Sequence, residues 1–246
     1  MAKKTKSART GFTTGACATA AARAATQALV SAQVPESVEC LLPNGQRVYF
    51  PVTDTHQGEG RTHAGVIKDA GDDPDCTHGA HLTADARLLP DLPGKVRIEG
   101  GDGVGMVSLP GLGLQVGGPA INSVPRRSIE DNVRLTAGLF LDQQGVQITI
   151  SVPGGQVMTR KTFNPRLGIL GGISTLGTTG IVRPWSTVAF RATVVQGIEV
   201  AAAQGQESYS PPVGAPKGSP WGGCPILPPC VLYKWGIFCV RLPHRK

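Results

Sequence analysis

The first strongly patterned segment of the chain reads Thr13-Thr-Gly-Ala-Cys-Ala-Thr-Ala-Ala-Ala-Arg-Ala-Ala-Thr-Gln-Ala-Leu29. Eight of the fourteen residues from Ala16 to Leu29 are alanine, the strongest helix former, and a threonine before them can cap the first turn. The segment therefore predicts a helix that packs close to its neighbours. Its first amides could hold an anion. A purely structural helix explains the same residues more simply.

The patterns around this helix predict an α+β fold with a mixed sheet. Residues 38–52 read as a β-hairpin with a type I′ turn at Asn44-Gly45. Further strands are expected at 64–68, 81–88, 95–99 and 146–152. Ser128-Ile-Glu-Asp131 reads as a capping box that opens a helix to about Phe140, and another helix is expected from Trp185-Ser186 to about Gln204.

Charged and titratable side chains are concentrated in one segment that follows a predicted strand, Lys68-Asp-Ala-Gly-Asp-Asp-Pro-Asp-Cys-Thr-His-Gly-Ala-His81. Its glycines and proline exclude a regular helix. Its four carboxylates repel one another, so something must offset their charge. A metal ion, basic residues elsewhere in the chain, or water could do this, and a solvated acidic turn is the simplest alternative.

The net charge of +7 does not indicate a nucleic-acid binder. Five lysines and arginines follow Glu207 with no acidic residue among them, which leaves residues 1–207 with a net charge of +2 and no basic stripe interleaved with aromatic residues. The six cysteines form no CxxC pair, and no signal peptide or membrane span is predicted. We therefore expect a cytoplasmic protein with reduced thiols, without nucleic-acid or membrane partners.

Two glycine-rich stretches lack known nucleotide-binding spacings. Gly100–Gly105 follows a strand but is not a dinucleotide fingerprint, and Gly168–Gly180 lacks the lysine of an NTPase loop. We expect Gly100–Gly105 to be a tight loop where the backbone approaches a ligand or another backbone. Thr178-Thr179-Gly180 repeats Thr13-Thr14-Gly15, although three residues do not establish an internal repeat.

Several long sequence motifs, taken together in their order along the chain, resemble the cobalt-precorrin-5B C1-methyltransferases of anaerobic cobalamin biosynthesis. They span about residues 9–206 and comprise Thr10–Gly15, Lys68–His81, Gly100–Gly105, Pro119–Arg126, Lys161–Arg166 and Gly177–Pro184. The resemblance implies methyl transfer from S-adenosylmethionine to ring carbon C1 of a cobalt-bound tetrapyrrole. A protein-bound metal is not expected, because the substrate carries its own cobalt.

The resemblance also suggests where the site residues lie. The titrating candidates for catalysis are Asp69, Asp72, Asp73, Asp75 and His78. The candidates for holding the methyl donor are Thr13, Thr14, Gly15, Gly101, Gly103, Gly105, Thr178, Thr179 and Gly180. The candidates for holding the carboxylate-fringed substrate are Arg126, Lys161, Asn164, Arg166 and Arg183, since cationic side chains pair with carboxylates.

The family continues past the length of this chain with a Rossmann-like second domain. We expect a flexible N-terminus at 1–8, an α+β domain at 9–184, the first helix of the second domain at 185–206, and an aberrant, disordered tail at 207–246. The tail has no acidic residue after Glu207 and is rich in proline. Codons that could encode it can, when read in a shifted frame, encode sequences that resemble the family. We therefore expect a frameshift near Ser208. Such a chain would have little activity.

Three functions remain open from the sequence. The first is the methyltransferase, which could form a homo-oligomer. The second is a non-catalytic module that binds tetrapyrroles or anions through the same arginines and glycine loops. The third is a divalent-metal hydrolase built on the Asp/His loop, which ranks last because the family words explain the same residues.

Overall fold

The computed structural model describes residues 8–58 and 60–206, together with four two-residue strands beyond them. Those strands pair as β12 (Ser208–Tyr209) with β15 (Val240–Arg241) and β13 (Val231–Leu232) with β14 (Ile237–Phe238). Disorder and a frameshift were predicted for residues 207–246. Apart from these four strands, that range lies outside the described residues.

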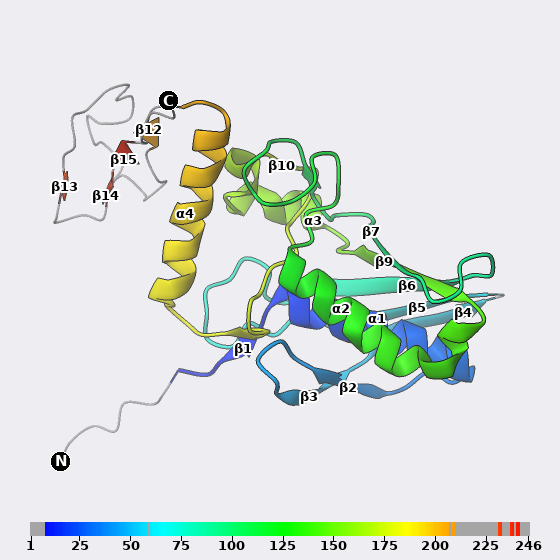
Figure 1. Ribbon diagram of the computed structural model, residues 1–246. Helices are drawn as coiled ribbons and strands as arrows, with labels where there is room; N and C mark the ends of the chain where they lie inside the picture. Colours follow the sequence, from blue (N-terminus) through cyan, green and yellow to red (C-terminus); the bar gives the residue numbers. More distant parts are fainter. Residues whose placement is uncertain are drawn as a thin grey trace, which may run out of the picture.

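A five-stranded sheet forms the centre of the molecule (Figure 1). Its strands lie in the order β4 (Thr53–Gly58), β5 (Arg61–Ile67), β6 (His81–Leu89), β9 (Gly145–Ser151) and β7 (Val96–Gly100). The pairs are antiparallel except β7 with β9, which is parallel. The predicted α+β class, the mixed sheet and the four predicted strands within it are confirmed, and β4 was not predicted.

The alanine-rich segment forms α1 (Thr14–Ser31), which crosses one face of this sheet beside α2 (Ser123–Ala137). Thr13 is its N-cap and accepts a hydrogen bond from the Ala16 amide at 3.1 Å. Thirteen of its eighteen residues are buried, because the sheet, α2 and strand β2 (Ser37–Leu41) all contact it. Alanine suits this position because its small side chain allows such close packing on several sides. The helix prediction is confirmed.

The predicted hairpin is confirmed as β2 (Ser37–Leu41) paired with β3 (Arg47–Pro51), but its turn is not type I′. A type I′ turn needs positive φ at both central residues, and here Gly45 alone has it, at 84°. The amide of Gly45 donates to the Leu42 carbonyl at 2.9 Å. The turn thus starts at Leu42, which lets Pro43 occupy the second position, where its fixed φ fits.

The expected helix start at Ser128 is wrong. Helix α2 runs from Ser123 to Ala137 with Asn122 as N-cap, so Ser128 lies inside it, buried against Thr19 of α1. Pro125 falls in the first turn, where a missing N–H costs no hydrogen bond, and so does not interrupt the helix. A 3₁₀ turn, η1 (Gly138–Asp142), follows.

Most of the remaining elements form a smaller layer at one end of the sheet. The layer holds β8 (Met106–Val107) paired with β10 (Ile169–Leu170), α3 (Gly155–Met158), η2 (Thr159–Lys161) and η3 (Asn164–Leu167). The pair β1 (Gly11–Phe12) and β11 (Ile181–Val182) instead packs against the main core through Phe12 and Ile181. The predicted last helix is confirmed as α4 (Thr187–Ala203), capped by Ser186. Its Val200 joins a small core with Val107, Ala120, Leu167 and Ile169.

Candidate functional site

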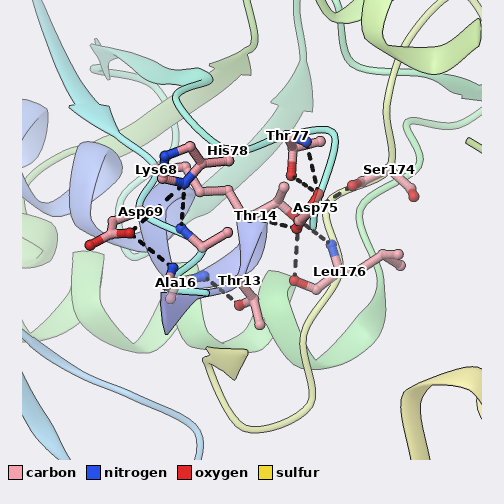
Figure 2. A network of polar contacts seen from close by, with 12 residues as sticks. Thr13, Thr14, Ala16, Lys68, Asp69, Asp75, Thr77, His78, Ser174 and Leu176 are labelled. Atoms are coloured by element: carbon pink, nitrogen blue, oxygen red, sulfur yellow. Dashed lines mark hydrogen bonds and ion pairs between the residues drawn. The ribbon is translucent and has the colours of Figure 1, made fainter. Parts of the chain in front are cut away.

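The two Thr-Thr-Gly motifs, far apart in sequence, meet at the start of α1. Figure 2 shows Thr13 and Thr14 at this point, with Leu176 beside Thr14. The Thr13 amide donates to the Gly180 carbonyl at 3.0 Å, and the Gly15 amide donates to the Leu176 carbonyl at 2.8 Å. The Thr14 hydroxyl accepts from the Leu176 amide at 2.9 Å. The six residues Thr13–Gly15 and Thr178–Gly180 therefore lie at one junction, with β1 and β11 paired beside them.

These contacts also occupy two of the donors that a helix N-terminus offers to an anion. The Gly15 amide is paired with Leu176, and the Ala16 amide is paired with the Thr13 hydroxyl. A Cβ on Gly15 would lie 2.7 Å from the Leu176 carbonyl oxygen, so glycine permits this close approach. The junction supports the structural interpretation of the helix start, and the side chains of Thr178 and Thr179 remain exposed beside it.

Each carboxylate of the acidic loop has a protein partner. Asp69 forms a two-pronged ion pair with the Arg9 guanidinium. Asp72 accepts from the Arg9 amide at 2.6 Å, and Asp73 accepts from the Trp185 amide at 3.2 Å. Asp75 accepts from the Lys68 ammonium at 2.6 Å. Of the alternatives that the sequence left open, basic residues of the chain itself offset the charge of Asp69 and Asp75, and backbone amides hold Asp72 and Asp73.

The partners shift the acidity of two of these carboxyls. Hydrogen bonds from the Arg9 guanidinium and the Gly71 amide lower the pKa of Asp69 to about 2. Burial raises the pKa of Asp75, but the charge of Lys68 and hydrogen bonds from Lys68 and Thr77 outweigh burial, so the net shift is downward. Both groups are anionic at neutral pH, so neither carries a proton to donate.

Lys68 is fully buried beneath the loop, beside α1. Its charge acts on the thiol of Cys17, in the first turns of α1, but burial dominates and raises the pKa of Cys17 to about 12. Cys17 is therefore a thiol rather than a thiolate at neutral pH, which excludes it as a nucleophile.

His78 is a histidine of the loop with an exposed side chain. Its Nδ1 accepts a hydrogen bond from the Ala70 amide at 3.1 Å, which places the proton of the neutral ring on Nε2. Asp69 Oδ1 lies 3.8 Å from the same Nδ1. The side chain is more than half exposed, and no hydrogen bond to Nε2 occurs among the described residues. His78 can thus exchange a proton with a bound molecule through Nε2.

The loop Gly100–Gly105 lies against other backbone segments. A Cβ on Gly103 would fall on the Val152 carbonyl oxygen, and one on Gly105 would meet the backbone of Gly172. Gly101 similarly faces Ser151. The expected close approach to another backbone is confirmed, and it accounts for these glycines without a ligand.

The predicted substrate residues divide into two groups. Asn164 is buried and braces the chain, donating to the Gly172 carbonyl and accepting from the Ser174 hydroxyl, each at 3.2 Å. Arg126 donates to the Ile98 carbonyl at 3.1 Å. Lys161, Arg166 and Arg183 are exposed, and Lys161 lies near enough to Cys76 to act on its pKa.

Sequence patterns assigned no role to Arg9, to the Trp185 amide or to the buried end of Lys68, which together hold the acidic loop. Lys68 had a usable signal, since a lysine that ends an apolar strand before four carboxylates can pair with one of them. Arg9 and Trp185 carried no comparable signal. In the described part of the chain, no three His, Cys, Asp or Glu side chains form a metal-binding group. No helix among these residues is long and apolar enough to span a bilayer.

Comparisons with known proteins agree with the resemblance carried by the sequence motifs. A family model described as CbiD matches residues 1–184. The chain is 64% identical over 209 residues to the cobalt-precorrin-5B C(1)-methyltransferase of Dechloromonas aromatica, covering 84% of this chain and 53% of the relative. It is 57% identical over 239 residues to the protein of that name from Methylococcus capsulatus, covering 97% of this chain and 63% of the relative.

A solved structure shares the fold. The crystal structure of a cobalamin biosynthesis protein (cbiD) from Archaeoglobus fulgidus matches with a TM-score of 0.55 and 32% identity, over 77% of this chain and 59% of that one. The chain therefore spans between about half and two thirds of the length of these relatives. The Methylococcus match extends past residue 206, and the predicted frameshift stays a prediction.

Proposed function

The chain belongs to the CbiD family, and on that basis we propose that it carries the N-terminal part of a cobalt-precorrin-5B C1-methyltransferase. The observation that carries the proposal is the 64% identity to a relative of that name over 84% of this chain. In the reaction, the S–CH₃ bond of S-adenosylmethionine breaks with its electron pair left on sulfur. A carbon–carbon bond forms at C1 with an electron pair from the macrocycle, giving cobalt-precorrin-6A and S-adenosylhomocysteine.

We place the site where the acidic loop, the start of α1 and residues 174–185 meet. The protein has to align sulfur, methyl and C1 and to exclude water, because the electron-rich ring is itself the nucleophile. We assign proton movement to His78, since its Nε2 forms no hydrogen bond within the part of the chain that the structure describes. Asp69, Asp72, Asp73 and Asp75 shape the loop around it and supply negative charge. At this junction the exposed hydroxyls of Thr178 and Thr179 suit the methyl donor better than the Gly15 and Ala16 amides, which are already paired.

We further propose that α4 begins a second, Rossmann-like domain. The support is its sequence position and its apolar outer face, on which Val188 and Val195 are exposed. The boundary near residue 185 is not sharp, because Val200 of α4 packs into the small core of the preceding layer.

Two measurements test the function. Titration calorimetry with S-adenosylhomocysteine should show saturable binding if the methyl-donor site exists, whereas a module that binds only tetrapyrroles would show none. Incubation with S-adenosylmethionine and cobalt-precorrin-5B should add one methyl group to the substrate by mass spectrometry. Sequencing of the DNA around codon 207 accompanies both, because a frameshifted chain should bind weakly and turn over slowly or not at all.

A further inference from the structure

Two imidazole rings lie side by side on the sheet face that α1 does not cover. The register pairs His56 of the edge strand β4 directly with His63 of β5, and His63 directly with Asp85 of β6. Thr62 donates to the Ala25 carbonyl of α1 at 2.6 Å, so its neighbour His63 points to the other side of the sheet. Because residues directly opposite each other share a face, the three side chains form one row across three strands.

The two rings have the spacing that a shared metal ion requires. Their centroids are 6.1 Å apart and their planes are inclined at 35°. An ion bound about 2.0–2.1 Å from a nitrogen of each ring would lie roughly 3 Å from each ring centre, so one ion fits between them. His56 is exposed on the edge strand, and its ring can turn towards His63 to complete the angle at the metal.

Asp85 prepares His63 to act as a ligand. Asp85 Oδ1 lies 2.8 Å from Nδ1 of His63. An ionised carboxylate only accepts hydrogen bonds, so the neutral ring carries its proton on Nδ1 and presents the lone pair of Nε2. Metal-binding histidines commonly have such a carboxylate behind them, which fixes the ring and raises its basicity. The negative charge of Asp85 also offsets part of the charge of an ion.

The surroundings select the kind of ion. Arg61 and Arg87, which are direct partners two residues further along β5 and β6, lie on the same face. Their charges disfavour Ca²⁺ and Mg²⁺, which need several oxygen ligands and gain little from imidazole. Zn²⁺, Ni²⁺ and Cu²⁺ bind imidazole nitrogen strongly. The row therefore suits a divalent transition metal.

We propose that His56 and His63 bind one divalent transition-metal ion, with Asp85 positioning His63 and water completing the coordination. This ion is distinct from the cobalt of the substrate, and the proposal goes beyond the proposed function. Strand β4 pairs only with β5 within the described sheet, and its register is broken between Thr53 and His56. A metal bridge between β4 and β5 fastens this edge strand to the sheet.

The test uses the full chain without a histidine tag and follows Ni²⁺ binding by titration calorimetry. Iodoacetamide first blocks the accessible thiols, so that cysteines do not compete for the ion. His56→Gln and His63→Gln should each abolish saturable binding, and Asp85→Asn should weaken it about 10- to 100-fold. The control is His81→Gln. His81 also pairs with an aspartate, Asp54, at 3.1 Å, but its direct partner on β5 is not a histidine, so affinity should stay at the wild-type value.

Thermal melting gives a second readout. Excess Ni²⁺ should raise the melting temperature of wild type and His81→Gln but not that of His56→Gln, because only a folded site binds the ion. If circular dichroism shows that His63→Gln is unfolded, His56→Gln, a change at an exposed side chain, carries the comparison. Equal Ni²⁺ affinity of wild type and His56→Gln would overturn the proposal. Saturation only above about 1 mM Ni²⁺, as for isolated surface histidines, would overturn it too.

Discussion

Lys68 Nζ lies 2.6 Å from Asp75 Oδ2, and the Lys68 side chain has no exposed surface. The carboxylate is also held by the amide and hydroxyl of Thr77, at 2.8 and 2.7 Å. An ammonium group enclosed in protein is tolerable only with such a partner. The acidic loop is thus tied to the core beneath it by one ion pair.

Asp75→Asn should therefore destabilise the protein strongly. It leaves the Lys68 charge buried without a counter-charge, at a cost of about 3 kcal/mol in the free energy of unfolding measured with urea. Lys68→Met should cost less, because Asp75 keeps its Thr77 bonds and partial contact with water. The control is Glu39→Gln, which breaks the surface pair with Arg47 and should cost under about 1 kcal/mol. Equal costs for Asp75→Asn and Glu39→Gln would contradict the buried pair.

Gly103→Ala should destabilise the protein more than Gly113→Ala. Both glycines have left-handed backbone, with φ of 69° and 66°, so each alanine incurs a similar strain of about 1–2 kcal/mol. At Gly103 the added methyl also collides with the Val152 carbonyl, whereas at Gly113 it meets nothing within 4 Å. We expect about 3 kcal/mol or more for Gly103→Ala by urea unfolding. Matching losses at both positions would show that the close backbone approach is not rigid.

The Arg9–Asp69 pair should contribute a pH-dependent stability. The folded pKa of Asp69 is about 2, below its value near 3.9 in an unfolded chain. Its contribution is complete above the unfolded pKa and is lost as the pH falls through the folded one. The stability difference between wild type and Asp69→Asn should be constant above about pH 5 and shrink from about pH 4 to pH 2. Asp91→Asn, at an exposed carboxyl that forms no ion pair within the described residues, should show no such window.

Cysteine alkylation should follow burial. The thiols of Cys17 and Cys40 are buried, with pKa values raised to about 12, whereas Cys76 is half-buried with a smaller rise. Iodoacetamide at pH 8 should modify Cys76 before Cys17 and Cys40, as read by peptide mass spectrometry. Urea should remove the difference. Early labelling of Cys17 in the native protein would show that α1 separates from the sheet.

Local patterns predicted the regular elements well. Alanine content located α1, and alternation located β5, β6, β7 and β9, because these signals depend on neighbours in sequence. The helix start at Ser128 was wrong because Ser128–Asp131 matches a capping box but lies inside a helix that begins at Ser123, after Asn122, with Pro125 in its first turn. The turn at Asn44 was wrong because Pro43 restricts the backbone more than the Asn-Gly pair directs it.

The candidate site was predicted in content but not in arrangement. The sequence identified the acidic loop and both Thr-Thr-Gly words, yet their meeting depends on contacts across more than 160 residues, such as Thr14 with Leu176. It also could not show that the carboxylates are paired with Arg9, Lys68 and the Trp185 amide. Those pairings follow from chain topology rather than from spacing.

The pairing of β1 with β11 has a consequence for the order of synthesis. Phe12 is made early and Ile181 late, yet they are direct partners, and the Gly15 amide takes its acceptor from Leu176. A ribosome-bound chain therefore holds the start of α1 without its native partners until residues 174–182 emerge. Closing so long a loop is slow. During translation the first turn of α1 and the acidic loop would stay open to chaperones and proteases until these later residues are made.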